Sequence, residues 1–155
     1  MSKTGIFFPN SIVSIDLLPI EPIAGVHFIK GDFMEASMQR QLSEYINNRK
    51  VDIVMSDIAP NFSGNPSIDH LKQVKLIWNE YQIDMCESVI DFARLVAKQD
   101  CTLILKVLQG SEFQSFIATC KQTFQQVYLI KPKASRKESI ETYCILKSFK
   151  KWPVF

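Results

Sequence analysis

Residues that bind metals are scarce in this sequence, which holds two histidines and four cysteines among its 155 residues. No two cysteines stand in the Cys-x-x-Cys spacing that structural zinc sites commonly use, so the sequence predicts no bound metal. Each cysteine lies in an apolar stretch. This pattern predicts buried free thiols of the kind found in a reducing compartment.

Long hydrophobic runs are also absent, since no eighteen consecutive residues are apolar. A transmembrane helix needs roughly twenty such residues, so the sequence predicts no membrane span. The first ten residues lack the pattern of a transit peptide and the long apolar core of a signal peptide. We therefore expect any targeting signal to lie upstream of residue 1.

Charge is nearly balanced over the chain, with 18 basic and 16 acidic residues, but it is unevenly distributed. Residues 131–151 hold seven basic and two acidic side chains. Such a local excess can bind a polyanion. It can equally be a solvated segment that favours solubility, and charge alone does not separate the two.

Strand-like and helix-like segments alternate along the chain. Runs rich in β-branched and apolar residues alternate with segments whose apolar residues recur every three or four positions. This alternation predicts one α/β domain over residues 1–155 with a mostly parallel sheet. The expected strands are 12–15, 26–29, 51–55, 102–107, 126–130 and 142–146, and the expected helices are 37–47, 68–98 and a segment capped by Ser111.

The segment 68–98 has the clearest helical pattern. Its large apolar residues recur at intervals of three and four, and we expect them to pack in the core rather than bind a cofactor. They are Leu71, Val74, Trp78, Tyr81, Met85, Val89, Phe92 and Val96.

Three expected strands end at or just before an aspartate, namely Asp16, Asp32 and Asp57. Ligands of open α/β sheets bind beyond the carboxyl ends of the strands, where these carboxylates would lie near one another. There they could accept hydrogen bonds from ribose hydroxyls or an amine. Each could also simply cap its own loop.

Lys106 interrupts the otherwise apolar strand 102–107. A buried ammonium is unfavourable, so the lysine must pair with a carboxylate or lose its charge. A desolvated neutral lysine is a competent general base. The alternative is a lysine on the half-exposed face of a strand.

Six short motifs follow one another in order along the chain. They are Asp16-Leu17-Leu18-Pro19 with residues 22–26; Gly31-Asp32-Phe33; residues 55–61 with Ser63-Gly64; Leu105-Lys106-Val107 with Gln109-Gly110; residues 131–136; and Glu141-Thr142-Tyr143. In this order they resemble the FtsJ-like RNA 2′-O-ribose methyltransferases, which use S-adenosyl-L-methionine. The resemblance extends over residues 12–147 and implies a Rossmann-like class I methyltransferase sheet with helices on both faces.

The resemblance also implies a role for each matching residue. Asp16 resembles the acid that binds the cofactor ribose, and Asp32 resembles the acid that holds the adenine amine, with the backbone N–H of Phe33 nearby. Asp57, which would also contact the adenosine half, matches one acid of the family's Lys-Asp-Lys-Glu tetrad. Lys106 and Glu141 match its last two members.

In that reading Lys106 removes the proton of the ribose 2′-hydroxyl, while Asp57 and Glu141 position the lysine and tune its basicity. No metal is required.

The basic stretch, defined here as Lys131, Lys133, Arg136 and Lys137, resembles the family's RNA-facing loop and would contact phosphates. The implied partner is large-subunit ribosomal RNA, with a uridine as the target, or a pre-ribosomal particle. The implied protein is a monomer that acts away from membranes, in mitochondria or the cytoplasm.

Two pieces of the family pattern are not found in this sequence: the first tetrad lysine, and the strand and glycine-rich turn that cradle the methionine end of the cofactor. The sequence is therefore similar to a family member that lacks its N-terminal part. It could be a shortened product of an active enzyme. The rival interpretation is a non-catalytic RNA-binding fragment or pseudoenzyme.

Overall fold

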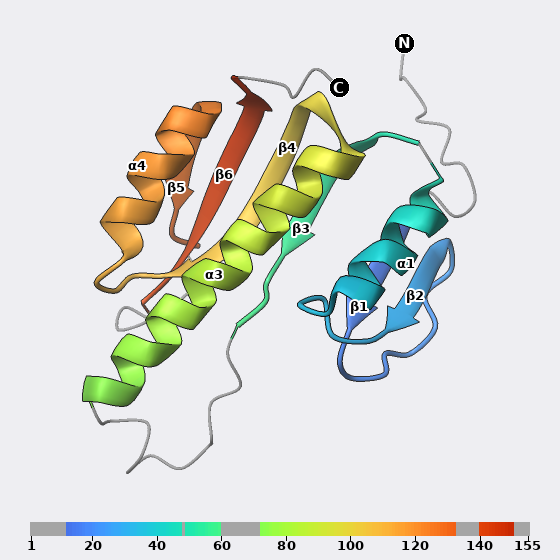
Figure 1. Cartoon of the computed structure of the whole chain (residues 1–155), viewed down its shortest axis with the longest axis horizontal. Coiled ribbons are helices and arrows are strands. Elements are labelled where there is room, and N and C mark those ends of the chain that lie inside the picture. Colours follow the sequence, from blue (N-terminus) through green and yellow to red (C-terminus); the bar gives the residue numbers. More distant parts are fainter. Residues whose placement is uncertain (1–11, 48, 60–71, 133–139, 151–155) are drawn as a thin grey trace. The chain divides into compact units, whose positions relative to one another are not determined.

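The structure is a computed structural model, and it describes residues 12–47, 49–59, 72–132 and 140–150, without the side chains of 72–78. The chain divides into two compact units, Met1–Arg49 and Lys50–Phe155, which are described separately (Figure 1). The expectation of one domain over residues 1–155 stays a prediction.

The first unit contains two parallel strands and a helix. Strand β1 (Ile12–Asp16) pairs in parallel with β2 (Val26–Lys30), and helix α1 (Ala36–Ile46) follows. The helix buries Leu42 and Ile46, which lie one turn apart on one face. It ends at Asn47, whose left-handed backbone (φ 49°) is a common way for a helix to stop.

The second unit is a four-stranded sheet with two helices. Its elements are β3 (Val51–Ser56), α3 (Lys72–Val96), β4 (Ala97–Leu108), α4 (Phe113–Thr123), β5 (Phe124–Ile130) and β6 (Glu141–Phe149). The strand order is β3-β4-β6-β5. The fold is therefore mixed α/β, as the alternating pattern predicts.

The prediction of a mostly parallel sheet is wrong for this unit. Strand β3 is parallel to β4, but β6 is antiparallel to both β4 and β5. Ten residues, 131–140, connect β5 to β6. A parallel crossover usually needs a dozen residues or more and often a helix, so a connection this short favours an antiparallel return.

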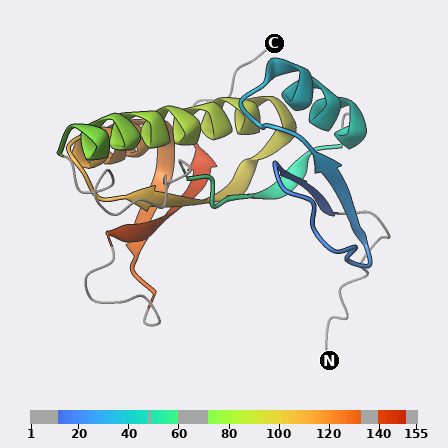
Figure 2. The same cartoon turned by 90° about the horizontal axis from the view of Figure 1, so that it is seen from below.

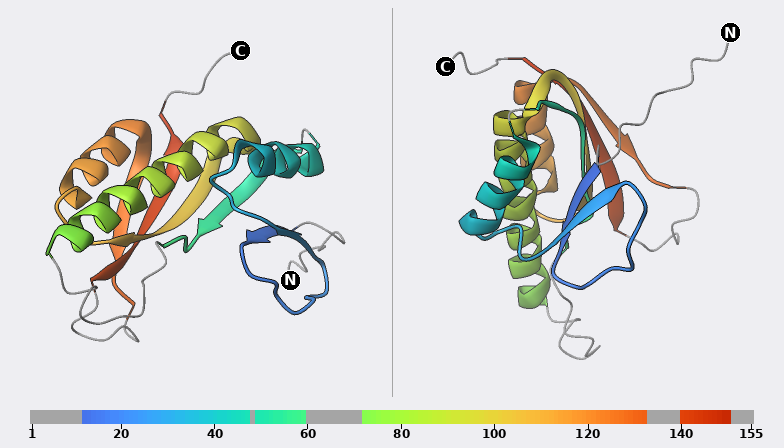
Figure 3. Two further views of the ribbon diagram at one scale, coloured as in Figure 1. Left: turned by 60° about the horizontal axis from the view of Figure 1, so that its bottom comes forward. Right: turned by 90° about the vertical axis from the view of Figure 1, so that its right-hand side faces the viewer.

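Helices α3 and α4 cover the same face of this sheet, as Figure 2 and Figure 3 show. Alternate residues of β4 and β6 point to that face and are almost inaccessible, among them Leu103, Leu105 and Leu146. The resemblance implies helices on both faces of the sheet. In the described part of this unit, helices cover one face. The other face of β4 carries half-buried side chains, Lys106 among them.

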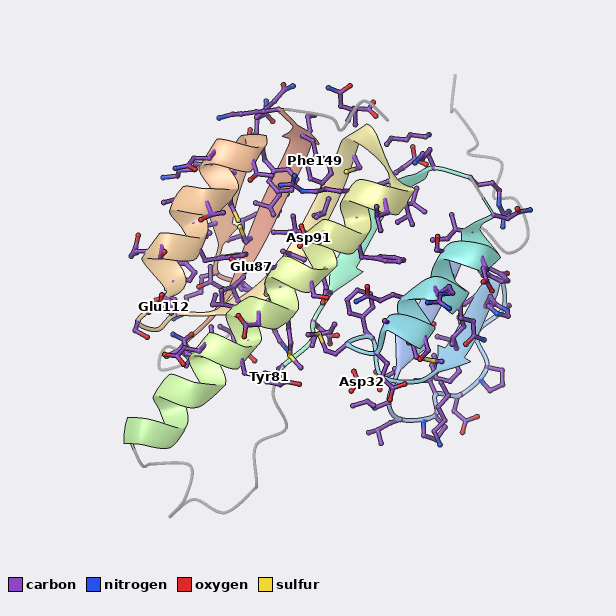
Figure 4. All side chains as sticks on the ribbon, in the orientation of Figure 1. Asp32, Tyr81, Glu87, Asp91, Glu112 and Phe149 are labelled. Carbon is purple, nitrogen blue, oxygen red and sulfur yellow. The ribbon has the colours of Figure 1, made fainter. Side chains whose placement is uncertain are left out.

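The expected helical face is correct for Met85, Val89, Phe92 and Val96, which are buried, but wrong for Tyr81. Tyr81 is exposed on α3 (Figure 4), and its neighbour Gln82 is completely buried instead. Leu71 and the side chains of Val74 and Trp78 lie outside the described residues.

Ser111 does not cap α4 as expected. The helix begins after Glu112, and the Ser111 hydroxyl accepts a hydrogen bond from the Asn79 amide (3.3 Å). All four cysteines are buried and unbridged, as predicted. Among the described helices, none combines the length and the apolar character needed to cross a bilayer.

Candidate active site at the strand ends

Lys106 and Glu141 form the centre of the candidate site. Lys106 lies near the end of β4, and Glu141 begins β6. The Lys106 Nζ lies 4.0 Å from Glu141 Oε1, and the lysine side chain is only 16% exposed. Of the two outcomes expected for a lysine in this strand, pairing with a carboxylate or loss of its charge, the structure shows the pairing.

Strand register explains why these two side chains meet. Lys106 is directly opposite Tyr143, and Glu141 is two residues before Tyr143 on the same strand. Residues two apart in a strand share a face, and long side chains reach such diagonal neighbours. Lys106, Tyr143 and Glu141 therefore lie on one face of the sheet.

Asp57 follows the last residue of β3. Ser56 pairs with Leu105, so the next step along both parallel strands reaches Asp57 and Lys106. Asp57 is exposed, and within the described residues no ion pair of 4.0 Å or less joins it to Lys106. The structure thus brings Lys106 and Glu141 into contact and leaves Asp57 at the neighbouring strand end.

Two glutamines brace this strand end. The side-chain Nε2 of Gln109 donates to Thr142 Oγ1 (2.8 Å), and the backbone N–H of Gln109 donates to the Ile140 carbonyl (2.9 Å). These two bonds connect the loop after β4 to the start of β6. Gln82, from α3, donates to the Lys106 carbonyl (2.6 Å). Sequence reasoning missed Gln82. Its signal was a polar residue three before Met85 and four before Cys86, in a buried stripe of α3 that also holds the polar Asn79.

The first unit holds two of the predicted cofactor residues at one edge of its own sheet. Asp16 ends β1 and pairs with Lys30, and Asp32 follows two residues after Lys30. Asp16 Oδ1 accepts the Leu18 amide and Asp32 Oδ1 accepts the Met34 amide, both at 2.8 Å. Figure 4 shows Asp32 in the loop after β2. Each acid therefore caps its loop with one carboxylate oxygen.

Phe33 lies beside Asp32, where the resemblance places it. It is half-buried, and its carbonyl accepts a hydrogen bond from Gln39 Nε2 on α1 (3.1 Å). This bond fixes the loop that carries Asp32 against the following helix.

The basic stretch is described only at its start. Lys131 is exposed just after β5, whereas Lys133, Arg136 and Lys137 lie outside the described residues. Their predicted contact with RNA phosphates stays a prediction.

The second unit holds four buried thiols, of which Cys86, Cys120 and Cys144 lie close enough to interact electrostatically. Burial raises the pKa of the Cys86 thiol to about 12 and that of Cys101 to about 11. A hydrogen bond with Cys144, together with burial, raises the pKa of Cys120. A nucleophilic cysteine needs a depressed pKa and access to solvent, so Cys86, Cys101 and Cys120 are structural groups.

A parallel strand pair with carboxylates at its ends is typical of α/β proteins that bind a nucleotide-like ligand beyond the strands. The comparisons with known proteins agree with this class. The sequence model of the FtsJ-like methyltransferases matches residues 2–149. The chain therefore belongs to the FtsJ-like methyltransferase family.

Relatives and a solved structure of the same kind match most of the chain. Ribosomal RNA large subunit methyltransferase E of Burkholderia ambifaria is 40% identical over 141 residues, which cover 91% of this chain and 60% of the relative. The enzyme of the same name from Dechloromonas aromatica is 39% identical over 134 residues, covering 86% and 61%. A crystal structure described as a ribosomal RNA methyltransferase from Plasmodium falciparum superposes with a TM-score of 0.70 at 26% identity, covering 89% of this chain and 71% of that one. The chain spans about three fifths of the length of these curated relatives.

Proposed function

We propose that this chain transfers a methyl group from S-adenosyl-L-methionine to a ribose 2′-oxygen of ribosomal RNA. The observation that carries the proposal is the half-buried Lys106 amine facing the Glu141 carboxylate at a strand end. The names of the relatives support ribosomal RNA as the substrate class.

In the proposed reaction the Lys106 Nζ first releases its own proton to solvent, and the neutral amine then accepts the proton of the 2′-hydroxyl. General-base catalysis of this kind contributes roughly 10²–10⁴-fold to a rate. The Glu141 carboxylate 4.0 Å away stabilises the ammonium that forms, and Asp57 adds a second negative charge at the adjacent strand end. Low exposure of the lysine strengthens these interactions, because water screens them less.

The acids of the first unit fit the adenosine half of the cofactor. A carboxylate beyond a strand end can accept hydrogen bonds from a ribose diol, as proposed for Asp16, or from an amine, as proposed for Asp32. Each already holds one oxygen against a backbone amide, which fixes its orientation. When bound, the cofactor would supply an electrophilic methyl carbon.

RNA would be held by the basic stretch, because contacts from lysine and arginine to phosphates set affinity and orientation. Lys133, Arg136 and Lys137 are placed there by sequence alone. Lys131, which is exposed at the end of β5, is the described member.

Methyl transfer to RNA by the whole chain tests the proposal. Lys106→Ala should lower the transfer rate by at least about 100-fold, since it removes the base. Lys106→Arg should fail nearly as badly, because a guanidinium does not accept a proton near neutral pH. RNA affinity should stay within about twofold in both variants.

The matched control is Lys98→Ala. Lys98 lies on the same strand, β4, but near its start, where it forms an exposed ion pair with Asp52. Its removal should leave the transfer rate unchanged. Full activity of Lys106→Ala, or an equal loss in the Lys98 variant, would contradict the assignment of Lys106 as the base.

A further inference from the structure

Gln82 makes an unusual pair of contacts with the backbone of β4. Its side chain lies on α3 and is completely buried. The amide Nε2 donates to the Lys106 carbonyl at 2.6 Å, and Oε1 accepts from the Leu108 amide at 3.2 Å. The nitrogen and the oxygen of the Gln82 side chain therefore both bond the backbone of β4, one at Lys106 and the other two residues later.

The position of these bonds follows from where β3 ends. The register of the β3–β4 pair stops at Ser56 and Leu105. Residues two apart in a strand direct their backbone polar groups to the same edge, so the Lys106 carbonyl and the Leu108 amide share one edge of β4. Among the described residues no strand pairs with that edge beyond Leu105, and Gln82 is the hydrogen-bond partner there.

Neighbouring residues of α3 reinforce the same strand end. The Cys86 thiol, one helical turn after Gln82, approaches the Lys106 carbonyl at 3.7 Å. Asn79, one turn before Gln82, is buried and donates to the Ser111 hydroxyl. A Cβ on Gly110 would overlap the Asn79 amide, so the chain passes close to α3 just after Lys106.

Packing alone does not explain a buried glutamine at this position. A buried amide is unfavourable unless both of its ends are hydrogen-bonded, and an apolar side chain would fill the same volume without that requirement. The amide is suited to a backbone that would otherwise leave a carbonyl and an N–H unpaired in the interior.

We propose that Gln82 is a positioning residue for the methyl-transfer reaction. It fixes the backbone of Lys106 and thereby the direction of the Lys106 amine toward Glu141 and the incoming hydroxyl. This inference rests on the proposed function, and it adds a residue from α3 to the strand-end site. Gln82 itself touches neither substrate nor cofactor.

Two variants of Gln82 separate positioning from packing. Gln82→Met keeps the length of the side chain and removes both hydrogen bonds. Gln82→Glu keeps the acceptor for Leu108 but can donate to the Lys106 carbonyl only when the carboxyl is protonated. The control is Gln114→Met, because Gln114 is exposed on α4.

Amide hydrogen exchange measured by NMR reports the local effect. In Gln82→Met the Leu108 amide should exchange at least about tenfold faster, while the mid-strand Leu103 amide changes by less than about twofold. Nuclear Overhauser contacts between the Lys106 and Glu141 side chains should weaken in the same variant. The Gln114 control should match the wild type. Equal acceleration at Leu103 and Leu108, or none at either, would overturn the proposal.

Kinetics give the second readout. Gln82→Met should lower kcat by at least about tenfold with KM for the cofactor within about twofold, because Lys106 acts in the chemical step. The kcat of Gln82→Glu should recover toward the wild-type value as the pH falls and the carboxyl gains its proton. A raised KM with unchanged kcat, or no recovery at lower pH, contradicts a positioning role.

The two proposals fail in different ways. If the wild-type chain and its Lys106 variant both lack methyl transfer, the proposed function fails, and the exchange and Overhauser data still decide whether Gln82 fixes Lys106. If Lys106 proves essential but Gln82→Met retains full kcat and an unchanged Leu108 exchange rate, only the positioning role of Gln82 is wrong.

Discussion

The two units hold their strand-end residues by different means. In the first unit, Asp16 and Asp32 each bond an amide only two residues further along the chain. In the second unit, Lys106 is held by Gln82, which is 24 residues away, and by Glu141 on another strand. A short acid at a strand end can thus organise its own loop, whereas a lysine within a strand must be placed by the tertiary fold.

The two units also differ in how many apolar side chains they bury. Three apolar side chains are buried among the described residues of the first unit: Ile29, Leu42 and Ile46. The sheet of the second unit packs many side chains that are wholly inaccessible, such as Leu103 and Leu105. A close-packed interior transmits small shifts, so the position of Lys106 depends on that core.

Shortening a buried leucine should change the free energy of unfolding more than any other substitution considered for the two units. Leu105→Ala, next to Lys106, should lower the free energy of unfolding by about 4 kcal/mol, because a fully buried leucine leaves a cavity among rigid neighbours. Leu42→Ala in the first unit should cost only about 2 kcal/mol, since its small apolar cluster can collapse. Urea denaturation followed by circular dichroism measures both. A greater loss for Leu42→Ala would reverse the contrast between the units.

Alkaline pH should affect the second unit through its buried thiols. Burial raises the pKa of Cys86 to about 12, above the ordinary thiol value of 9.0. The folded state then keeps a proton that the unfolded chain releases, so the stabilisation is complete below pH 9 and is lost as the pH rises toward 12.

Between pH 9 and pH 11 this loss should amount to about 2 kcal/mol, measured as the free energy of unfolding. Cys86→Ala should show a shallower decline over that range. Other groups titrate in both proteins, so the difference between their pH profiles isolates Cys86. Parallel profiles would mean that the thiol ionises equally in the folded and unfolded states.

Asp16→Asn separates loop capping from cofactor binding in the first unit. The asparagine oxygen can still accept the Leu18 amide, so stability should change by less than about 0.5 kcal/mol. Loss of the carboxylate should weaken S-adenosyl-L-methionine binding about tenfold, as measured by calorimetric titration. Glu44→Gln, at an exposed position of α1, is the control. Unchanged affinity in Asp16→Asn would leave Asp16 with only its capping role.

The smallest effect is expected from the basic stretch. Lys133→Ala combined with Arg136→Ala should reduce the salt dependence of RNA binding by about two units of slope, about one per lost phosphate contact. The affinity should fall to a similar extent for many RNAs. Lys98→Ala serves as the control for a lysine outside the stretch. An unchanged slope in the double variant would make the stretch a solvated surface.

Sequence reasoning predicted the elements well where the pattern is local. Strand β1, which carries Asp16, lies where it was predicted, and β4 contains the predicted strand 102–107 around Lys106 but begins five residues earlier, at Ala97. Local physics also predicted that Lys106 would either pair with a carboxylate or lose its charge, since it stands in an apolar run.

Non-local features were harder to predict. The antiparallel direction of β6 depends on the path of the chain after β5. The burial of Gln82 in place of Tyr81 depends on where β3 stops. Periodicity ranks an aromatic residue above an amide for burial. Here the preference is reversed, because Gln82 supplies the hydrogen bonds that the backbone of β4 needs at Lys106 and Leu108. The sequence around Gln82 does not show where those backbone groups lie.

The position of the methyl group on the product shows whether the chain methylates a ribose and whether Lys106 is required. RNA incubated with the chain and S-adenosyl-L-methionine is digested to nucleosides, which are identified by mass spectrometry. We expect nucleosides methylated on the ribose 2′-oxygen with the wild type and with Lys98→Ala, and none with Lys106→Ala. Methyl groups on the bases, or ribose methylation that persists without Lys106, would contradict this expectation.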